Sequence, residues 1–229
     1  MRSFILVVVV LAIPTAARAA SFDCSRAATP IEKTICAEPA LSKLDDRTVA
    51  AYADVVQTLG IEDDDDPQGD LLLKGHQDWS AARNRCGAAS NCLLQQYLRR
   101  LAVLGFKADP QAPSALDGLI GRYGTPVEPA RELVIMAASG NTVLVNLRVT
   151  ATDWTCSFTG IARSDGAGGL RVTRVEPKGV NQGAHRIALT PTRLGLAVRV
   201  PDPKDDVSSR YCGAGGSLVH PFPRRDAAR

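Results

Sequence analysis

The chain has few of the residues and motifs that most often carry enzymatic chemistry. It contains three histidines, and none of them stands at metal-ligand spacing from another histidine or from a cysteine. It has no Gly-x-Ser-x-Gly elbow, and its glycine-rich stretch lacks the Lys-Ser/Thr ending of a phosphate-binding loop. The acidic run near residue 63 fails the spacing of an EF-hand, because Pro67 stands where a third acid is needed. We therefore expect no enzyme activity, no cofactor and no metal site.

Long apolar runs are also scarce. After residue 19 no apolar stretch approaches the length of about 20 residues that a bilayer requires. Residues 1–19 have the features of a signal peptide: Arg2 at the start, a short apolar run over residues 4–13, and Ala17-Arg18-Ala19 as a cleavage site. No cysteine follows this site directly, which argues against a lipid anchor. The sequence thus predicts a periplasmic or secreted protein without a membrane span once residues 1–19 are removed.

Six cysteines follow the predicted signal peptide: Cys24, Cys36, Cys86, Cys92, Cys156 and Cys212. An even count in an exported chain indicates three disulfides. The last two cysteines are expected to pair and to join a central strand to the C-terminal segment. The first four allow three pairings. We favour Cys24–Cys92 with Cys36–Cys86, because these bridges would connect the two halves of the helical region.

Residues 20–106 have the pattern of a helical domain. Apolar residues recur every three or four positions between residues 41 and 59, which predicts an amphipathic helix that Gly60 can end. Thr29-Pro30-Ile31-Glu32 forms a capping box with proline at the first helical position. Two further helices are expected on either side of the short turn at residues 87–91. The sequence therefore predicts a helical hairpin braced by disulfides.

The same region resembles the N-terminal domain of LprI-type lysozyme inhibitors over roughly residues 22–104. The first half of the pattern is Cys24, Thr29-Pro30-x-Glu32-Lys33-x-Ile35-Cys36, Pro39-x-Leu41-x-x-Leu44-Asp45 and Tyr52; the second is Trp79-x-x-x-Arg83-x-x-Cys86-x5-Cys92-x4-Tyr97. The chain departs from the pattern at His76, where the family usually has Gln, and at Asn84, where it usually has Asp. The resemblance implies an exported domain, and some members of the family bind lysozyme.

The spacing of apolar residues along the chain changes after residue 115. Residues 107–115 are polar and spaced by prolines, as expected of a linker. Apolar and polar residues then alternate over residues 143–150, 154–159 and 193–200, and glycine-rich turns separate these runs. Residues 116–229 are therefore predicted to form an antiparallel meander of seven or eight strands with one buried face, as a small barrel or sandwich. The predicted fold class is α+β.

Two groups of residues are candidates for contact with a partner. The first is the acidic run Asp63, Asp64, Asp65 and Asp66; the second is the pair Trp79 and Arg83, whose residue types are common in interface hot spots. Each group has a second interpretation. The acidic run can be a solvated loop, since like charges repel and stay exposed. Trp79 can pack inside the bundle near Tyr52 and Tyr97, with Arg83 over its face.

Charge is divided unevenly between the two predicted domains. Residues 20–106 hold 9 bases and 13 acids, whereas residues 107–229 hold 16 bases and 11 acids. An acidic helical domain suits a basic partner and disfavours nucleic acid. The leading hypothesis is a protein-binding module that blocks the substrate cleft of a cationic lysozyme or related muramidase. The alternatives are an envelope structural or small-ligand-binding protein with an apolar pocket beside Trp154 and Phe158, and a hydrolase of unrecognised type that uses His76 or His185.

Overall fold

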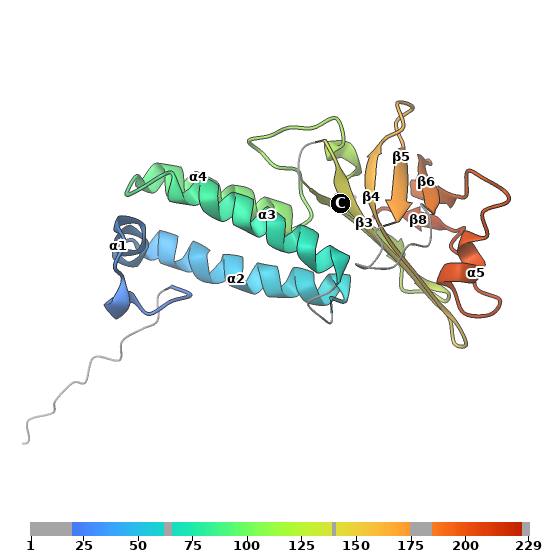
Figure 1. The fold of residues 1–229 in the computed structure, drawn as a ribbon, viewed down its shortest axis with the longest axis horizontal. Helices are drawn as coiled ribbons and strands as arrows, with labels where there is room; N and C mark the ends of the chain where they lie inside the picture. The colour runs from blue at the N-terminus through green and yellow to red at the C-terminus, as the bar shows by residue number, and fades with distance from the viewer. Residues whose placement is uncertain (1–19, 62–65, 139–140, 175–184, 226–229) are drawn as a thin grey trace, which may run out of the picture.

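The computed structural model describes residues 20–61, 66–138, 141–174 and 185–225. Helices form the first part of this chain and an antiparallel sheet forms the second, so the predicted α+β class is confirmed (Figure 1). The predicted signal peptide and Asp63, Asp64 and Asp65 lie outside the described residues. The helices extend side by side from one end of the sheet, which gives the molecule an elongated shape.

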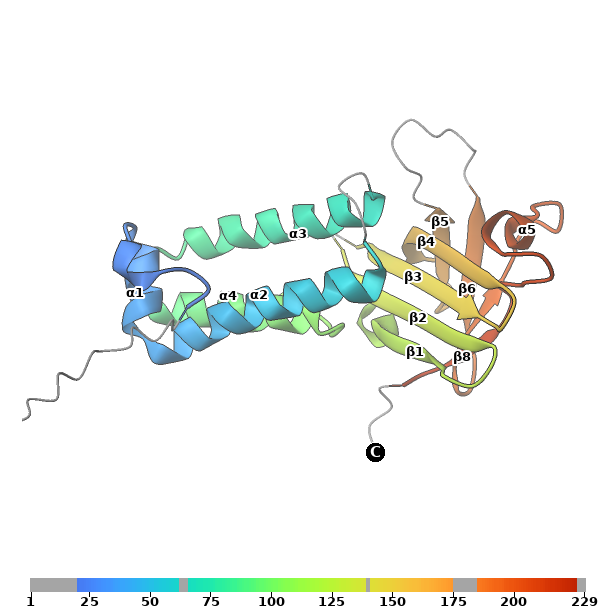
Figure 2. The same cartoon turned by 90° about the horizontal axis from the view of Figure 1, so that it is seen from below.

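Four α-helices make up the helical bundle: α1 (Pro30–Ala37), α2 (Pro39–Leu59), α3 (Pro67–Asn84) and α4 (Ser90–Leu104). The 3-10 helix η1 (Cys24–Arg26) precedes α1, and α1 lies across the ends of the other three helices (Figure 2). The capping box predicted at the start of α1 is present. The Glu32 amide donates to Thr29 Oγ1 over 3.2 Å, and the Glu32 carboxylate accepts the Thr29 amide over 2.9 Å.

The strands follow one another around a nearly closed barrel. They are β1 (Gly121–Thr125), β2 (Ala130–Ala137), β3 (Val143–Thr150), β4 (Thr155–Ser164), β5 (Leu170–Arg174), β6 (Arg186–Pro191), β7 (Gly195–Arg199) and β8 (Pro221–Pro223). Each strand pairs antiparallel with the next, and the Arg225 amide donates to the Arg122 carbonyl over 2.9 Å where the last strand meets the first. Short helices lie before β1 (η2, Asp117–Leu119) and before β8 (α5, Val207–Tyr211). The predicted meander is therefore confirmed as a barrel.

Large apolar side chains fill the interior of the barrel. Every second residue of β3 points inward and is fully buried, as its alternating sequence predicts. The same interior contains Ile135, Phe158, Val172, Leu189 and Phe222, all without solvent exposure. Phe158, which the sequence suggested as a pocket wall, instead packs edge-on against Tyr211 with ring centroids 5.1 Å apart.

The bundle joins the barrel through a second apolar cluster. Its members come from α2, α3 and the end of α4 on one side and from the outer face of β2 and β3 on the other: Val55, Leu59, Leu72, Leu104, Phe106, Val134, Met136 and Leu144. These strands are consequently buried on both faces at this place, where the sequence predicted one buried face. Asn146 of β3 satisfies its amide there by donating to the Leu59 carbonyl (3.3 Å) and to Gln68 Oε1 (2.8 Å).

Glycine is required at the turn that ends α2. Gly60 has φ of 66°, in the left-handed region, and its amide donates to carbonyls of the last turn. A Cβ at this position would also lie only 2.7 Å from Nη2 of Arg148 on the barrel. The predicted cap is therefore confirmed, and the left-handed φ is the reason for glycine, because the flexible end of the Arg148 side chain could move away from a Cβ.

The disulfides differ from the preferred prediction. The bonds are Cys24–Cys36, Cys86–Cys92 and Cys156–Cys212. The last is the pair expected from the sequence, but the expected Cys24–Cys92 and Cys36–Cys86 bridges are wrong. The turn between α3 and α4 already brings the Cα atoms of Cys86 and Cys92 to 5.5 Å, and the Cα atoms of Cys24 and Cys36 are 5.7 Å apart. Both separations suit a disulfide, so each bridge closes a local loop.

The loop lengths predict a ranking of stability losses. Replacing Cys156 and Cys212 together with Ala opens a loop with a sequence separation of 56, against 6 for Cys86 and Cys92. The chain-entropy model then gives losses of about 4 and about 2.5 kcal/mol in the free energy of unfolding. Urea titrations of the two double variants beside the unchanged protein measure this difference. A larger loss of unfolding free energy in the Cys86/Cys92 variant would contradict the ranking by loop length.

Candidate functional site

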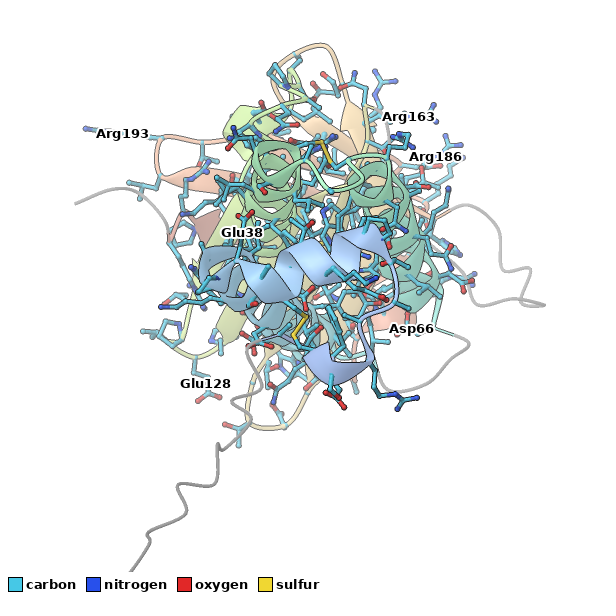
Figure 3. The ribbon with its side chains drawn as sticks, turned by 90° about the vertical axis from the view of Figure 1, so that its left-hand side faces the viewer. Glu38, Asp66, Glu128, Arg163, Arg186 and Arg193 are labelled. Carbon is cyan, nitrogen blue, oxygen red and sulfur yellow. A yellow bond between two sulfur atoms is a disulfide. The ribbon has the colours of Figure 1, made fainter. Side chains whose placement is uncertain are left out.

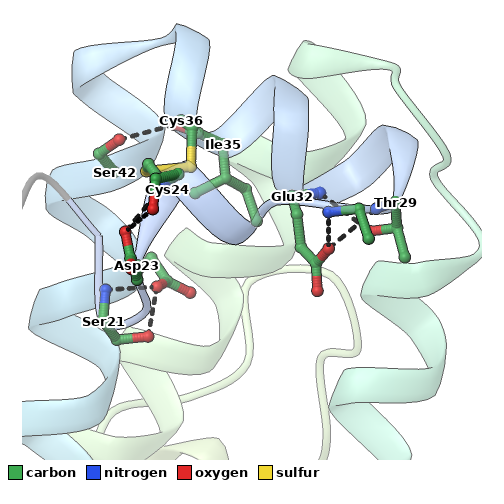
Figure 4. The surroundings of a disulfide bond; sticks show 11 residues. Ser21, Asp23, Cys24, Thr29, Glu32, Ile35, Cys36 and Ser42 are labelled. Carbon is green, nitrogen blue, oxygen red and sulfur yellow. Dashed lines mark hydrogen bonds between the residues drawn. A yellow bond between two sulfur atoms is a disulfide. The ribbon is translucent and has the colours of Figure 1, made fainter.

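The end of the bundle remote from the barrel is held together by cross-links; we call it the distal end. It consists of η1, α1, the start of α2, the end of α3 and the start of α4, and both local disulfides lie in it. Figure 4 shows the surroundings of the Cys24–Cys36 bond. Two side-chain contacts add to them. The Ser42 hydroxyl donates to the Ile35 carbonyl over 2.6 Å, and the Ser90 hydroxyl donates to the Glu38 carboxylate. The distal end is therefore rigid although few of its residues are in the long helices.

A buried carboxylate, Asp45 of α2, connects the separate segments of the distal end. Asp45 is only 5% exposed, and its Oδ2 accepts hydrogen bonds from the amide (2.9 Å) and the hydroxyl (2.5 Å) of Ser21. Its Oδ1 accepts the Tyr97 hydroxyl of α4 over 2.7 Å and lies 4.0 Å from Arg83 Nη1 of α3. Burial, followed by the hydrogen bond to Asp45, raises the pKa of Tyr97. One carboxylate thus binds the N-terminal segment, α3 and α4 to α2.

The structure uses Trp79 and Arg83 inside the bundle. Trp79 is 8% exposed, and its indole nitrogen donates to the Gln96 carbonyl of α4 over 2.8 Å. The Arg83 guanidinium lies 5.1 Å from the centre of the Trp79 ring and 3.4 Å from the Tyr97 hydroxyl. This geometry corresponds to the second interpretation of the sequence, in which the pair stabilises the helices. Arg83 is half-buried and still reaches the surface.

The two candidate groups do not form one surface. Asp66, the described member of the acidic run, caps the start of α3, where its Oδ1 accepts the Gln68 amide over 2.8 Å. Arg83 lies 17 residues further along the same helix, which corresponds to about 25 Å. Asp66 therefore lies before α3 at the end of the helix nearer the barrel, whereas Arg83 belongs to the distal end.

A hollow of about 340 Å³ opens on the distal end beside Asp45. Its wall is formed by the N-terminal segment, α1, α2 and the end of α3, and comprises Ser21, Phe22, Thr29, Ile31, Glu32, Ile35, Asp45, Arg83 and Asn84. Apolar side chains, the carboxylates of Glu32 and Asp45 and the guanidinium of Arg83 thus line one concave surface. The backbone amides of Thr29 and Ala28 hold the pKa of Glu32 below its usual value, so this side chain is an anion at neutral pH. Such a surface can receive an amphipathic side chain of a partner.

Sequence reasoning missed Phe22, Ile31 and Asn84 as members of this hollow. Phe22 comes from the segment before η1, and only the folded arrangement brings it opposite the last residue of α3. Ile31 lies inside the Thr29–Glu32 box, which was assigned a capping role alone. The departure from the family pattern at Asn84 was the one signal that could have directed attention to this position.

The histidines lie apart from one another. His76 packs in the bundle between Tyr52 and Trp79, with ring centroids 5.0 and 5.2 Å away. His185 precedes β6, and its Nδ1 is 2.9 Å from Oδ1 of Asp205. Over the described ranges, no three His, Cys, Asp or Glu side chains are grouped as metal ligands would be. His76 and His185 belong to different halves of the molecule and cannot act in one site.

The fold and its cross-links define an α+β protein in which a disulfide-braced helical bundle is packed on a nearly closed eight-stranded barrel. No protein-family model, curated protein or solved structure matches the chain. Within the described part of the chain, no helix combines the length and the apolar character needed to cross a bilayer. Three disulfides are typical of proteins that fold in an oxidising compartment.

The environment of His76 predicts a loss of stability in mild acid. Burial, with the nearby charges of Arg100 and Arg83, lowers the pKa of His76 below the 6.5 of an unperturbed imidazole. The unfolded chain therefore binds a proton more readily, and the free energy of unfolding falls as the pH drops below 6.5. His76→Gln should flatten this dependence between pH 8 and pH 5, as urea titrations at each pH would measure.

His220 provides the matched comparison. Burial and the charge of Arg131 also lower the pKa of His220, so His220→Gln should remove a separate part of the same slope. Carboxylates with lowered pKa, such as Glu32 and Asp165, change the free energy of unfolding mainly below pH 5, outside the range of this measurement. An unchanged slope in both variants would contradict this explanation.

Proposed function

We propose that the chain is an exported protein-binding module and that the distal end of the bundle binds the partner. The observation that carries this proposal is the convergence of the LprI-like pattern on one place. The Tyr97 hydroxyl and the Arg83 guanidinium meet at the carboxylate of Asp45, and both cysteine pairs of the pattern close loops beside it. The partner implied by the resemblance is a lysozyme or related muramidase, and the mechanism is steric occlusion of its substrate cleft.

The rigidity of the distal end supports binding to a protein. Association costs free energy when loops and side chains must be ordered, and a surface that is ordered beforehand avoids most of that cost. The disulfides and the hydrogen bonds of Asp45 order this surface before any partner arrives. The hollow bordered by Phe22 and Ile31 then offers a concave, partly apolar contact for one anchoring side chain.

Net charge differs between the helical domain and the barrel domain. The helical domain has more acids than bases, and the barrel domain has more bases than acids. Arg163, Arg186 and Arg193 of the barrel point outward at the periphery of the molecule when it is viewed onto the distal end (Figure 3). The excess of acids in the helical domain comes from residues 62–66, since the other residues of 20–106 hold 8 acids and 9 bases. A basic protein would be attracted by that run and repelled by the arginines of the barrel, which would make the rate of encounter sensitive to salt.

The proposed surface can be tested by closing the hollow. Asn84→Trp places a large ring at the rim, where Asn84 is exposed, and should weaken binding by tenfold or more, which corresponds to about 1.4 kcal/mol. Inhibition of cell-wall hydrolysis by several lysozymes, with the purified protein lacking residues 1–19, measures the effect. Dissociation constants of the complex at low and high salt measure the electrostatic contribution to binding.

Gln77→Trp is the matched control. Gln77 is exposed on the same helix but does not line the hollow, so this variant should inhibit as the unchanged protein does. Equal weakening by both substitutions would show that the hollow is not the contact. Absence of inhibition and of binding at micromolar concentrations of the unchanged protein would rule out lysozyme as the partner.

A further inference from the structure

An arginine occupies a core position of α4. The buried positions of this helix are Leu93, Tyr97, Arg100 and Leu104, spaced by four, three and four residues as on the inner face of an amphipathic helix. Arg100 is 5% exposed, which is unusual because a charged side chain loses its hydration when buried. Burial lowers its pKa to about 10, so the guanidinium still carries its charge at neutral pH.

Within the described residues, this buried charge has no hydrogen-bond partner on one edge. Nε and Nη2 of Arg100 are both buried and both lack an acceptor. These two groups lie on the same edge of the planar guanidinium and donate in parallel, which is the arrangement that binds both oxygens of a carboxylate. Gly75 of α3 lies beside Arg100, and a Cβ built there would be in ordinary van der Waals contact with Nη1, 3.6 Å away.

Arg100 lines a pocket of about 460 Å³ between the bundle and the barrel. The residues that line the pocket come from α3, α4, the end of β2, the start of β3 and the segment between residues 109 and 120. Its volume is within the range of small-molecule sites. Its apolar wall comes from both halves of the molecule: Leu71, Leu72, Val103, Ile120, Met136 and Leu144.

Arg85 lines the pocket at an exposed position, and most of the other charged groups there have partners in the protein. Lys74 pairs with Asp78 over 3.2 Å, Arg99 pairs with Asp109, and Asp117 accepts the Ser114 amide over 3.0 Å. Among the described residues that line the pocket, Arg100 is thus the buried charge without a counter-ion. One turn before it on α4, Gln96 also lines the pocket, and its buried Oε1 accepts no hydrogen bond from the described residues.

We propose that this pocket binds a small organic monoanion with an apolar chain, and that the guanidinium of Arg100 holds its carboxylate. The apolar chain lies along the aliphatic wall shared by α3, α4 and the β2–β3 hairpin. Gln96 accepts a hydrogen bond from a donor near the acid group. A single guanidinium balances one negative charge, so a carboxylate is favoured over a phosphate dianion. The lining of this pocket shares no residue with the distal hollow, and the proposal does not depend on the proposed partner.

Decanoate is a suitable probe for the site, with decanol as its uncharged counterpart and decyl phosphate as the other anion. Calorimetric titration of the protein lacking residues 1–19 should show binding of decanoate, at least tenfold weaker binding of decyl phosphate and no saturable binding of decanol. Decanoate should also raise the thermal unfolding midpoint, because it binds the folded state. Equal binding of decanoate and decanol, or no binding of decanoate, would overturn the proposal.

Two substitutions of Arg100 separate the binding role from a role in folding. Arg100→Met removes an unpaired buried charge while keeping a long, unbranched side chain, so it should raise the thermal midpoint and abolish the response to decanoate. Arg100→Lys keeps the charge but loses the two parallel donors, so it should bind decanoate at least tenfold more weakly. Decanoate binding by either variant as tight as that of the unchanged protein would refute the assignment.

Arg47→Met is the control for loss of a positive charge. Arg47 is exposed on α2 and does not line the pocket, so its decanoate affinity should be unchanged. Circular dichroism spectra establish that each variant is folded before titration. An Arg47 variant that loses binding as Arg100→Met does would show that the anion responds to overall charge and would overturn the site.

Discussion

The arrangement of the helices depends on a carboxylate that has been removed from water. Asp45 is buried in the bundle, and a buried charge is tolerated when donors replace its hydration. Those donors are far apart in the sequence: Ser21 lies before the first helix, Tyr97 is on the last, and Arg83 stands near the same oxygen. All of them must be in place together, so the shape of the distal end is determined by one side chain. The disulfides close local loops and leave this connection between the helices to Asp45 and the apolar core.

The bundle and the barrel are one packed structure because they share side chains. Leu59 and Leu104 of the helices lie in the same cluster as Val134 and Leu144 of the strands. A polar residue in that contact, Asn146, donates to the carbonyl of Leu59 and would leave an amide unsatisfied in any other packing of the two parts. Apolar contact supplies the attraction here, and the amide fixes how the helices are placed on the sheet. The orientation of the distal end relative to the barrel follows from this junction.

Local patterns in the sequence predicted the helices, the capping box at Thr29, the cap at Gly60 and the meander, because each depends on neighbouring residues. The disulfide pairing failed because it was chosen by the length of the loop closed, whereas the turn before Cys92 decides which sulfurs meet. The outer face of β3 was expected to be exposed, and Leu144 is buried because helices distant in sequence cover it. The distal hollow and the Arg100 pocket escaped prediction for the same reason. Their walls combine segments that no periodicity relates.

Arg100 is the place where the sequence departs from what the fold alone requires. A leucine there would continue the apolar face made by Leu93 and Leu104, would bury more apolar area and would leave no charge unpaired. Charged residues that the fold needs elsewhere in this chain have partners, as Asp45 does in its hydrogen bonds to Ser21 and Tyr97. Departures from local rules concentrate at functional sites, where stability is given up for binding. The pocket beside Arg100 provides the reason that the packing of the helices does not.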